Sequence, residues 1–418
     1  MARPAPIRLA GTIAATALCV AAATSAFART PPQDGVIILN NQLRLGDVIA
    51  GQTLNVEGAS DEVGATTSAS GNIVSATAQD RDIQVSSTQT SNGDVRSTTT
   101  LNLDGDLEGP VNATTQSRGN YLAAAAYGGD VAIEATQDVG PSEITAGSTL
   151  NGPTARLLGG ASIGVTTIGN TASMAASASH VSGTVIQRSE AGVRAENFAE
   201  TQYIPAAAEF ISQSIANTTA LNSGLASSQN LTIRQRSAGD AVTASTSANA
   251  ANAWDLAGRA RATANQTLLY NDGGSVVATT DQSNLSQVRA SATVTSYDWG
   301  GAVAVAAGTG NEVVAGNNDI YLEIDNSQVN SGGVEVTAEF AGTNGYDAYV
   351  SADAVGNAVT GYVCSTCQGN LIATNTQTNS GPVSATSTTT INGTGRAIAS
   401  SATAVGNTAA FYVSRPGS

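Results

Sequence analysis

The sequence predicts an all-β fold: a β-solenoid, similar to a parallel β-helix, of about eight repeats of roughly 47 residues. Two residue markers return along the chain with one phase, and the short runs between them alternate with the period of two that is typical of strands. Hydrophobic residues make up 41% of the chain and aromatic residues only 4%, because Ala and Val supply most of the apolar side chains. We therefore expect a thin Ala/Val-rich core between closely spaced backbones.

The first marker is a Gly-Asn or Ala-Asn dipeptide, and the second is a Gln that precedes it by 28–32 residues. Both recur at intervals of 46–50 residues. Amide side chains at matching positions of stacked strands form hydrogen-bonded ladders, as in cross-β structures, so we expect repeat ladders here. The Asn positions are Asn72, Asn120, Asn170, Asn217, Asn265, Asn311, Asn357 and Asn407. The Gln positions are Gln42, Gln89, Gln137, Gln187, Gln235, Gln282, Gln328 and Gln377.

Each module follows the same order of elements. A β-branched residue stands six or seven positions after the Gln, and a Thr/Ser-rich alternating run follows it. A run of small residues such as "AYVSADAVGN" comes next, and a strand such as "NNDIYLEIDNSQ" leads to the next Gln. The segment "AENFAETQYIPAAAEFISQSIAN" has helical content, but it contains Pro205 and keeps the module phase. The β-branched positions are Val48, Val95, Ile144, Val193, Val242, Val288, Val334 and Val383.

The length of the period bears on the architecture. About 47 residues are too many for one coil of a narrow solenoid, so we expect two coils per module. Some sixteen coils at about 4.7 Å each would make a rod roughly 75 Å long. A string of antiparallel hairpins or a propeller-like array is the alternative architecture with eight periods.

The N-terminus has the features of a secretory signal peptide over 1–28: Arg3 and Arg8, an apolar run over 9–23, and small residues before a cut at Arg29. We expect a short segment over 29–37, the repeat region over 38–413 and a tail over 414–418. All 17 basic residues are Arg, and removal of two of them changes the formal net charge from −15 to 15 − 32 = −17. Such an acidic surface disfavours nucleic acid as a partner.

Few residues suggest chemistry. His180 is the only His, and we expect it to be exposed or in a turn. Cys364 and Cys367 in "GYVCSTCQGN" favour a local disulfide in an exported chain, with free thiols, cross-links between chains, and metal or redox work as alternatives. The acids of 104–109 and 323–325 suit solvated turns and strand faces, with weak calcium binding or a glycosidase pair as alternatives. We predict no catalytic residue, no metal site and no cofactor.

The aromatic residues are concentrated in the C-terminal half of the chain. They would stack on sugar rings if they face outward, or cap the thin core if they face inward. They are Trp254, Trp299, Tyr297, Tyr321, Tyr346, Tyr349 and Tyr362.

An acidic, Lys-free chain rich in Ala, Ser, Thr and Asn, with a signal peptide and repeats such as "VGNAVTGYV" and "VGNTAAFYV", resembles the holdfast anchor proteins of stalked alphaproteobacteria. Within that group it is most similar to the large surface anchor subunit, the D member. The resemblance implies export through a curli-type outer-membrane secretion lipoprotein and assembly on the cell surface, at the pole or stalk tip, with a smaller curlin-like anchor subunit. It brings no catalytic residues.

These observations predict a non-enzymatic surface protein for cell adhesion, which anchors the adhesive holdfast polysaccharide to the envelope as a rod-like or polymeric β assembly. Repeated modules suit this role because many weak contacts add up. We expect self-association, and a direct or indirect contact with the polysaccharide. The alternatives are a curlin-like amyloid fibre subunit and an extracellular polysaccharide-modifying enzyme on a β-helix.

Overall fold

The computed structural model describes residues 35–364 and 369–413, which belong to one compact unit that begins at Gly35. The predicted signal peptide over 1–28, most of the 29–37 segment, the tail over 414–418 and Cys367 lie outside these residues. The described part of the chain is all-β and contains no helix. No helix long and apolar enough to cross a membrane therefore occurs among the described residues.

The first sheet contains eight strands, every one paired in parallel with its neighbours. Its order is β1 (Gly35–Arg44), β4 (Asp82–Ser91), β8 (Val131–Val139), β11 (His180–Ser189), β13 (Ser228–Ser237), β15 (Ser275–Asn284), β17 (Tyr321–Asn330) and β19 (Asn370–Asn379).

The second sheet contains thirteen strands and is also parallel throughout. Its main path is β2 (Val48–Val56), β5 (Val95–Leu103), β9 (Glu143–Leu157), β12 (Gly192–Gly224), β14 (Ala241–Asn271), β16 (Gln287–Asn317), β18 (Val334–Val363) and β20 (Val383–Ile391). Off this path lie β3 (Val63–Gln79), β6 (Asp106–Leu107), β7 (Val111–Tyr127), β10 (Ala161–Ser177) and β21 (Ala397–Tyr412).

This arrangement confirms the predicted β-solenoid and excludes the alternative of antiparallel hairpins, because every pairing between strands is parallel. The register also joins the β-branched residues of all modules into one row, from Val48 beside Val95 to Val334 beside Val383. The row is buried except at its two ends, where Val48 and Val383 are half-buried.

The expectation of two coils per module is wrong. Paired residues lie 46–50 positions apart, as Gly35 and Asp82 or Val111 and Ala161 do, so one period makes one coil. The reason is that the coil is wide: β1, β2 and β3 have 10, 9 and 17 residues. Eight strands at about 4.8 Å spacing then extend over roughly 34 Å, half of the expected length.

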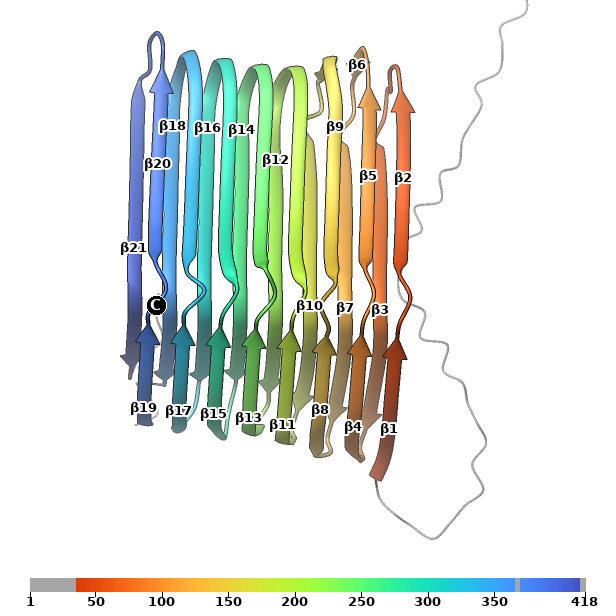
Figure 1. Ribbon diagram of the computed structural model, residues 1–418, viewed down its shortest axis with the longest axis vertical. Helices are drawn as coiled ribbons and strands as arrows, with labels where there is room; N and C mark the ends of the chain where they lie inside the picture. Colours follow the sequence, from red (N-terminus) through yellow and green to blue (C-terminus); the bar gives the residue numbers. More distant parts are fainter. Residues whose placement is uncertain (1–34, 365–368, 414–418) are drawn as a thin grey trace, which may run out of the picture. The chain divides into compact units, whose positions relative to one another are not determined.

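Each coil is flattened into two layers (Figure 1). The chain passes along a front strand of the β1 type, bends, continues along a front strand of the β2 type, turns over at the upper edge and returns as a long back strand. In β12, β14, β16 and β18 the strand continues through this upper corner. The register of β12 shifts between Ile204 and Ala207, which places Pro205 at an irregularity where its missing N–H is tolerated.

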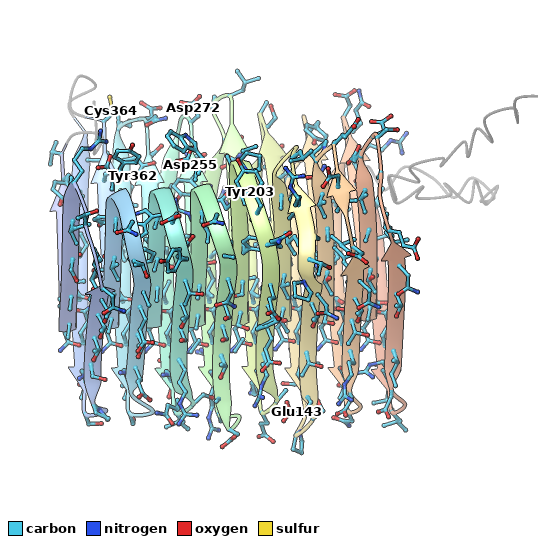
Figure 2. All side chains as sticks on the ribbon, turned by 90° about the horizontal axis from the view of Figure 1, so that it is seen from above. Glu143, Tyr203, Asp255, Asp272, Tyr362 and Cys364 are labelled. Atoms are coloured by element: carbon cyan, nitrogen blue, oxygen red, sulfur yellow. The ribbon has the colours of Figure 1, made fainter. Side chains whose placement is uncertain are left out.

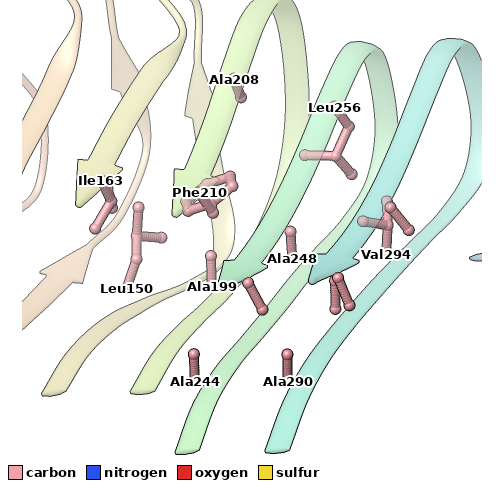
Figure 3. Packing of buried hydrophobic residues seen from close by; sticks show 14 of the residues in the cluster. Leu150, Ile163, Ala199, Ala208, Phe210, Ala244, Ala248, Leu256, Ala290 and Val294 are labelled. Atoms are coloured by element: carbon pink, nitrogen blue, oxygen red, sulfur yellow. The ribbon is translucent and has the colours of Figure 1, made fainter. Parts of the chain in front are cut away.

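Two apolar clusters fill the space between the layers. The first lies between the β2-type strands and the first halves of the back strands, and the second lies between the β1-type strands and the second halves. Ala is the most frequent residue in both. Figure 3 shows Ala199 beside Ala248 and Ala244 beside Ala290 at equivalent positions of neighbouring coils. Small side chains let the layers approach closely, as the composition predicts.

Candidate functional site

The eight Gln residues form one continuous hydrogen-bonded row. Each Nε2 from Gln89 onward donates to the Oε1 of the Gln in the preceding coil, at 2.7–2.8 Å. Each Nε2 also donates to a backbone carbonyl of the back layer, as Gln235 does to Gln266 O at 2.8 Å. The five Gln side chains from Gln89 to Gln282 are at most 2% exposed. The bonds therefore satisfy polar groups that water does not reach.

The eight Asn residues form a second row with the opposite direction. Each Nδ2 from Asn72 to Asn357 donates to the Oδ1 of the Asn in the following coil, at 2.7–2.9 Å. Each of these Nδ2 groups also donates to a front-layer carbonyl, as Asn217 does to Arg236 O at 2.9 Å. The Gln side chains thus link the front layer to backbone carbonyls of the back layer. The Asn side chains link the back layer to backbone carbonyls of the front layer.

The close approach of neighbouring backbones explains why a Gly precedes most of the Asn residues. A Cβ added at Gly119 would lie 2.5 Å from Gly169 O, and one added at Gly310 would lie 2.4 Å from Gly356 O. The backbones approach so closely at this bend that Gly is favoured, although Ala216 and Ala264 occupy the equivalent positions in two middle coils.

The other predicted chemical residues do not form a site in the described part of the chain. His180 is exposed at the start of β11, as expected, with its Nδ1 2.7 Å from Ser228 Oγ. Cys364 directly follows β18 while Cys367 lies outside the described residues, so their disulfide remains a prediction. No cluster of three or more His, Cys, Asp or Glu suited to a metal ion occurs among the residues described.

The two acidic segments have local roles in the structure. Hydrogen bonds from the Thr154 hydroxyl and the Gly105 N–H lower the pKa of exposed Asp104 below its usual range. Tyr321 donates a 2.6 Å hydrogen bond to Glu323, and this bond raises the pKa of the phenol. Asp104 lies in a turn after β5 and Glu323 on β17, so the two segments are separated by several coils.

A groove of about 430 Å³ opens at the upper corner of the middle and C-terminal coils. It is lined by residues from β12, β14, β16 and β18, and by Thr394 in the turn before β21. Figure 2 shows Tyr203 and Asp255 near this corner, on the side away from Glu143 at the start of β9. The lining residues are Tyr203, Pro205, Asn252, Ala253, Trp254, Asp298, Trp299, Gly300, Asn344, Gly345, Tyr346 and Thr394.

Aromatic rings dominate one wall of this groove. Trp254 is 57% exposed and Tyr346 is 49% exposed, and their ring centroids lie 6.1 Å apart at an interplanar angle of 64°. Trp299 is only 3% exposed and packs edge-on against Phe340, with ring centroids 4.9 Å apart. The two interpretations of the aromatic residues are thus both realised: Trp254 and Tyr346 face outward, while Trp299 belongs to the core.

Glycines in neighbouring coils provide the room for these rings. A Cβ at Gly300 would lie 2.9 Å from the Trp254 ring, so the indole of Trp254 lies directly over this residue. A Cβ at Gly345 would lie 2.2 Å from the Trp299 ring. Each large ring therefore covers a position in the next coil that has no side chain.

The polar residues of the groove lie in one row across the coils. The register places Tyr203 beside Asn252, Asn252 beside Asp298, and Asp298 beside Asn344. This row was not predicted from the sequence. The signal for it is positional, because Asn252, Asp298 and Asn344 recur at intervals of 46 residues, the same interval that separates the Asn residues of the amide row in these coils.

An ion pair borders the groove. Arg396 makes a bidentate contact with Asp347, through an Nε–Oδ1 bond of 2.9 Å and a second Nη2–Oδ2 bond. The hydrogen bonds from the guanidinium lower the pKa of Asp347 below its usual range. The same guanidinium carbon lies 5.3 Å from the centroid of the Tyr346 ring and so positions this ring at the groove.

The Trp299 indole N–H is a further polar feature of the groove. Trp299 lines the groove, and its Nε1 is buried without a hydrogen-bond partner among the described residues. Buried indole N–H groups usually have an acceptor. The groove therefore combines an exposed aromatic wall with a row of amide and carboxylate groups, and one of its lining residues has a buried, unpartnered N–H. The aromatic wall and the polar row together suit a polyhydroxylated ligand without negative charge.

A comparison with protein families assigns the chain to one of them. The family model described as holdfast attachment protein D matches residues 56–333, which is more than half of the chain. Searches of the curated proteins and of the solved structures gave no match. The chain therefore belongs to the holdfast attachment protein D family.

Proposed function

We propose that this protein fastens the adhesive polysaccharide of the holdfast to the cell envelope, and that the corner groove binds the polysaccharide directly. The family indicates a structural attachment protein of the cell surface. The observation that supports the proposal most strongly is the exposed pair Trp254 and Tyr346 above the polar row. The role is structural, and no catalytic step is part of it.

The groove has the two chemical elements that sugar recognition requires. A flat exposed ring such as that of Trp254 covers the apolar C–H face of a pyranose. Amide and carboxylate groups of Asn252, Asp298 and Asn344 can then donate to and accept from the hydroxyl groups at its edge. Since the groove is open at the surface, it suits an internal segment of a long chain as well as an end.

Charge narrows the class of sugar. The chain has a net charge of −15, and Asp298 in the groove forms no ion pair among the described residues. A polyanionic polysaccharide would be repelled at this site. The proposal is therefore for neutral or amino sugars within the polysaccharide.

The remaining expectations belong to the same proposal. The protein would be exported through an outer-membrane secretion lipoprotein and remain associated with the outer membrane at the cell pole. There it would act together with a smaller curlin-like anchor subunit. The groove is lined by residues at the corner of the solenoid, so the two layers and the other edge stay available for such a partner.

The proposal is tested with purified chain and solubilised fragments of the holdfast polysaccharide, by the mobility shift of the protein in gels that contain the fragments. Trp254→Ala should weaken binding about three- to tenfold, the effect of losing one aromatic contact. Tyr349→Ala is the matched control, because Tyr349 is 47% exposed and lies outside the groove. Equal binding of the two variants would assign the sugar contact to another surface, and no binding by the unaltered chain would make the attachment indirect.

A further inference from the structure

Both ends of the solenoid have open strand edges. In the described part of the chain, β1, β2 and β3 are each paired on one side only, and so are β19, β20 and β21 at the other end. The core is also open there, since inward residues that are fully buried in middle coils are only half-buried in these strands. Unpaired edges of this kind are sites for the addition of further strands.

The two amide rows end in complementary groups. At the N-terminal end Gln42 uses one N–H for Ile73 O and has a second N–H without an acceptor among the described residues, while Asn72 Oδ1 accepts no bond there. At the C-terminal end, within residues 35–364 and 369–413, Gln377 Oε1 accepts no bond and Asn407 uses only its Oδ1. The Gln row thus ends in a free donor at one end and a free acceptor at the other, and the Asn row ends in the reverse order.

The backbones of the two ends also match. The strands β19 and β1 have ten residues each, β20 and β2 have nine each, and β21 and β3 have sixteen and seventeen. The apolar rows continue in the same way, because the row of Val36 ends at Leu371 and the row of Val48 ends at Val383. The last coil therefore presents the edge that the first coil would accept as its predecessor.

The charges favour contact between these ends. Residues 369–413 contain one charged residue, Arg396, although the whole chain carries 32 acidic residues. Arg44 is the only charged residue in β1 and β2. Arg396 also precedes the row of Val63 by two positions, where the first coil has the exposed acids Asp61 and Glu62. The ends thus lack the like-charge repulsion of the remaining surface, and they place an Arg opposite acids.

We propose that the C-terminal end of one copy binds the N-terminal end of a second copy, so that both amide rows and all three strand edges continue across the joint. Gln42 of one copy then donates to Gln377 of the other, and Asn407 donates to Asn72. Because the two contacting surfaces differ, the joint does not close on a pair, and repetition of it produces a filament. This inference deepens the proposed anchoring function by giving the anchor its length, and it rests on that function only for its role.

Asn407→Asp is the variant that tests the joint most directly. It keeps the Oδ1 that accepts the 2.7 Å bond from Asn357, and it replaces only the free amide donor by an anionic oxygen. In the joint this oxygen would face Asn72 Oδ1, an acceptor. The matched control is Asn230→Asp, which adds the same charge at an exposed position of β13 in the middle of the stack.

Assembly of the purified full chain is followed by sedimentation velocity and electron microscopy. We expect the unaltered chain and Asn230→Asp to form filaments with an axial repeat of roughly 38 Å, which is eight strand spacings. Asn407→Asp should sediment as a folded monomer at pH 7 and recover assembly near pH 3, where the protonated carboxyl donates an O–H. Added in small amounts, it should shorten filaments of the unaltered chain, because it joins through its intact N-terminal end and blocks further growth.

Two results would overturn the inference: a chain that stays monomeric at all concentrations, or filaments that form equally well with Asn407→Asp. The variant does not alter any residue of the groove, so its binding of polysaccharide fragments is measured in parallel. A monomeric Asn407→Asp that still binds the fragments separates a failure of assembly from a failure of the proposed attachment.

Discussion

Truncation of one Asn in the middle of its row is the perturbation from which the structure predicts the largest effect on stability. Asn217 is fully buried and makes three hydrogen bonds with its side chain. Its Nδ2 donates to Asn265 Oδ1 and to Arg236 O, both at 2.9 Å, and its Oδ1 accepts from Asn170 Nδ2 at 2.8 Å. Asn217→Ala removes all three bonds and leaves the three partner groups without a replacement.

The magnitude follows from the partners that these groups lose. Each buried polar group that loses its partner costs about 1–3 kcal/mol, so the three together cost at most about 3–9 kcal/mol. Asn170 Nδ2 contributes least, because it keeps its bond to Arg188 O. A water molecule in the space left by the side chain would replace some of the lost hydrogen bonds. We therefore expect the free energy of unfolding to fall by about 3–5 kcal/mol. Asn407→Ala at the exposed end removes a single bond, and water can replace it there, so we expect a loss of at most about 1 kcal/mol.

The assay is urea denaturation followed by far-ultraviolet circular dichroism, at a concentration where the chain is monomeric. Hydrogen exchange of the amides in β12 and β14 provides the local measure, because coils of a solenoid can open separately. Losses of unfolding free energy within about 1 kcal/mol of each other for the two variants would refute the reasoning. They would mean that the amide rows follow the backbone register without stabilising it.

Two further predictions concern the register and one carboxyl group. Deletion of residues 188–235 joins Gln187 to Arg236 in register and should preserve the β signal, while deletion of 188–211 should abolish it; equal signals from the two would exclude stacking by whole coils. Partial desolvation of its carboxyl group is the main cause that raises the pKa of Glu143, so the folded state holds this proton more tightly than the unfolded state. The contribution of Glu143 is then favourable at low pH and is lost as the pH rises through its folded pKa. Glu143→Gln should therefore raise the melting temperature slightly at pH 7 and leave it unchanged at pH 3, whereas a decrease at pH 7 would show that attraction to Arg194 outweighs burial.

Most of the fold was predictable from the periodicity of the sequence. The phase of Gln89 and Asn120 places each beside its counterpart one period later, because parallel strands in register bring residues one coil apart into contact. The alternation of small apolar and polar residues correctly indicated strands with one buried side. The path of the chain within a coil was not predictable in the same way, since a period gives the number of residues per coil but not how many strands share them.

The groove shows the same limit at the level of a site. The sequence identified Trp254 and Tyr346 as possible sugar-stacking residues but left open whether they face outward. Their orientation depends on Gly300, which lies beneath the Trp254 ring from the next coil, and on Arg396, which holds Tyr346. These contacts join residues 46 and 50 positions apart, Trp254 with Gly300 and Tyr346 with Arg396, and the spacing along the chain does not say which way a side chain points.

By itself, the sequence determined the class of fold, the repeat and the residues of the two amide rows, because a parallel stack translates every periodic signal into a contact. Only the tertiary structure decided that one period makes one wide coil, that the corner forms a groove, and that the two ends expose complementary groups. Those features arise from the packing of the two layers and from the direction in which each amide donates, and neither is encoded in the spacing of residues along the chain.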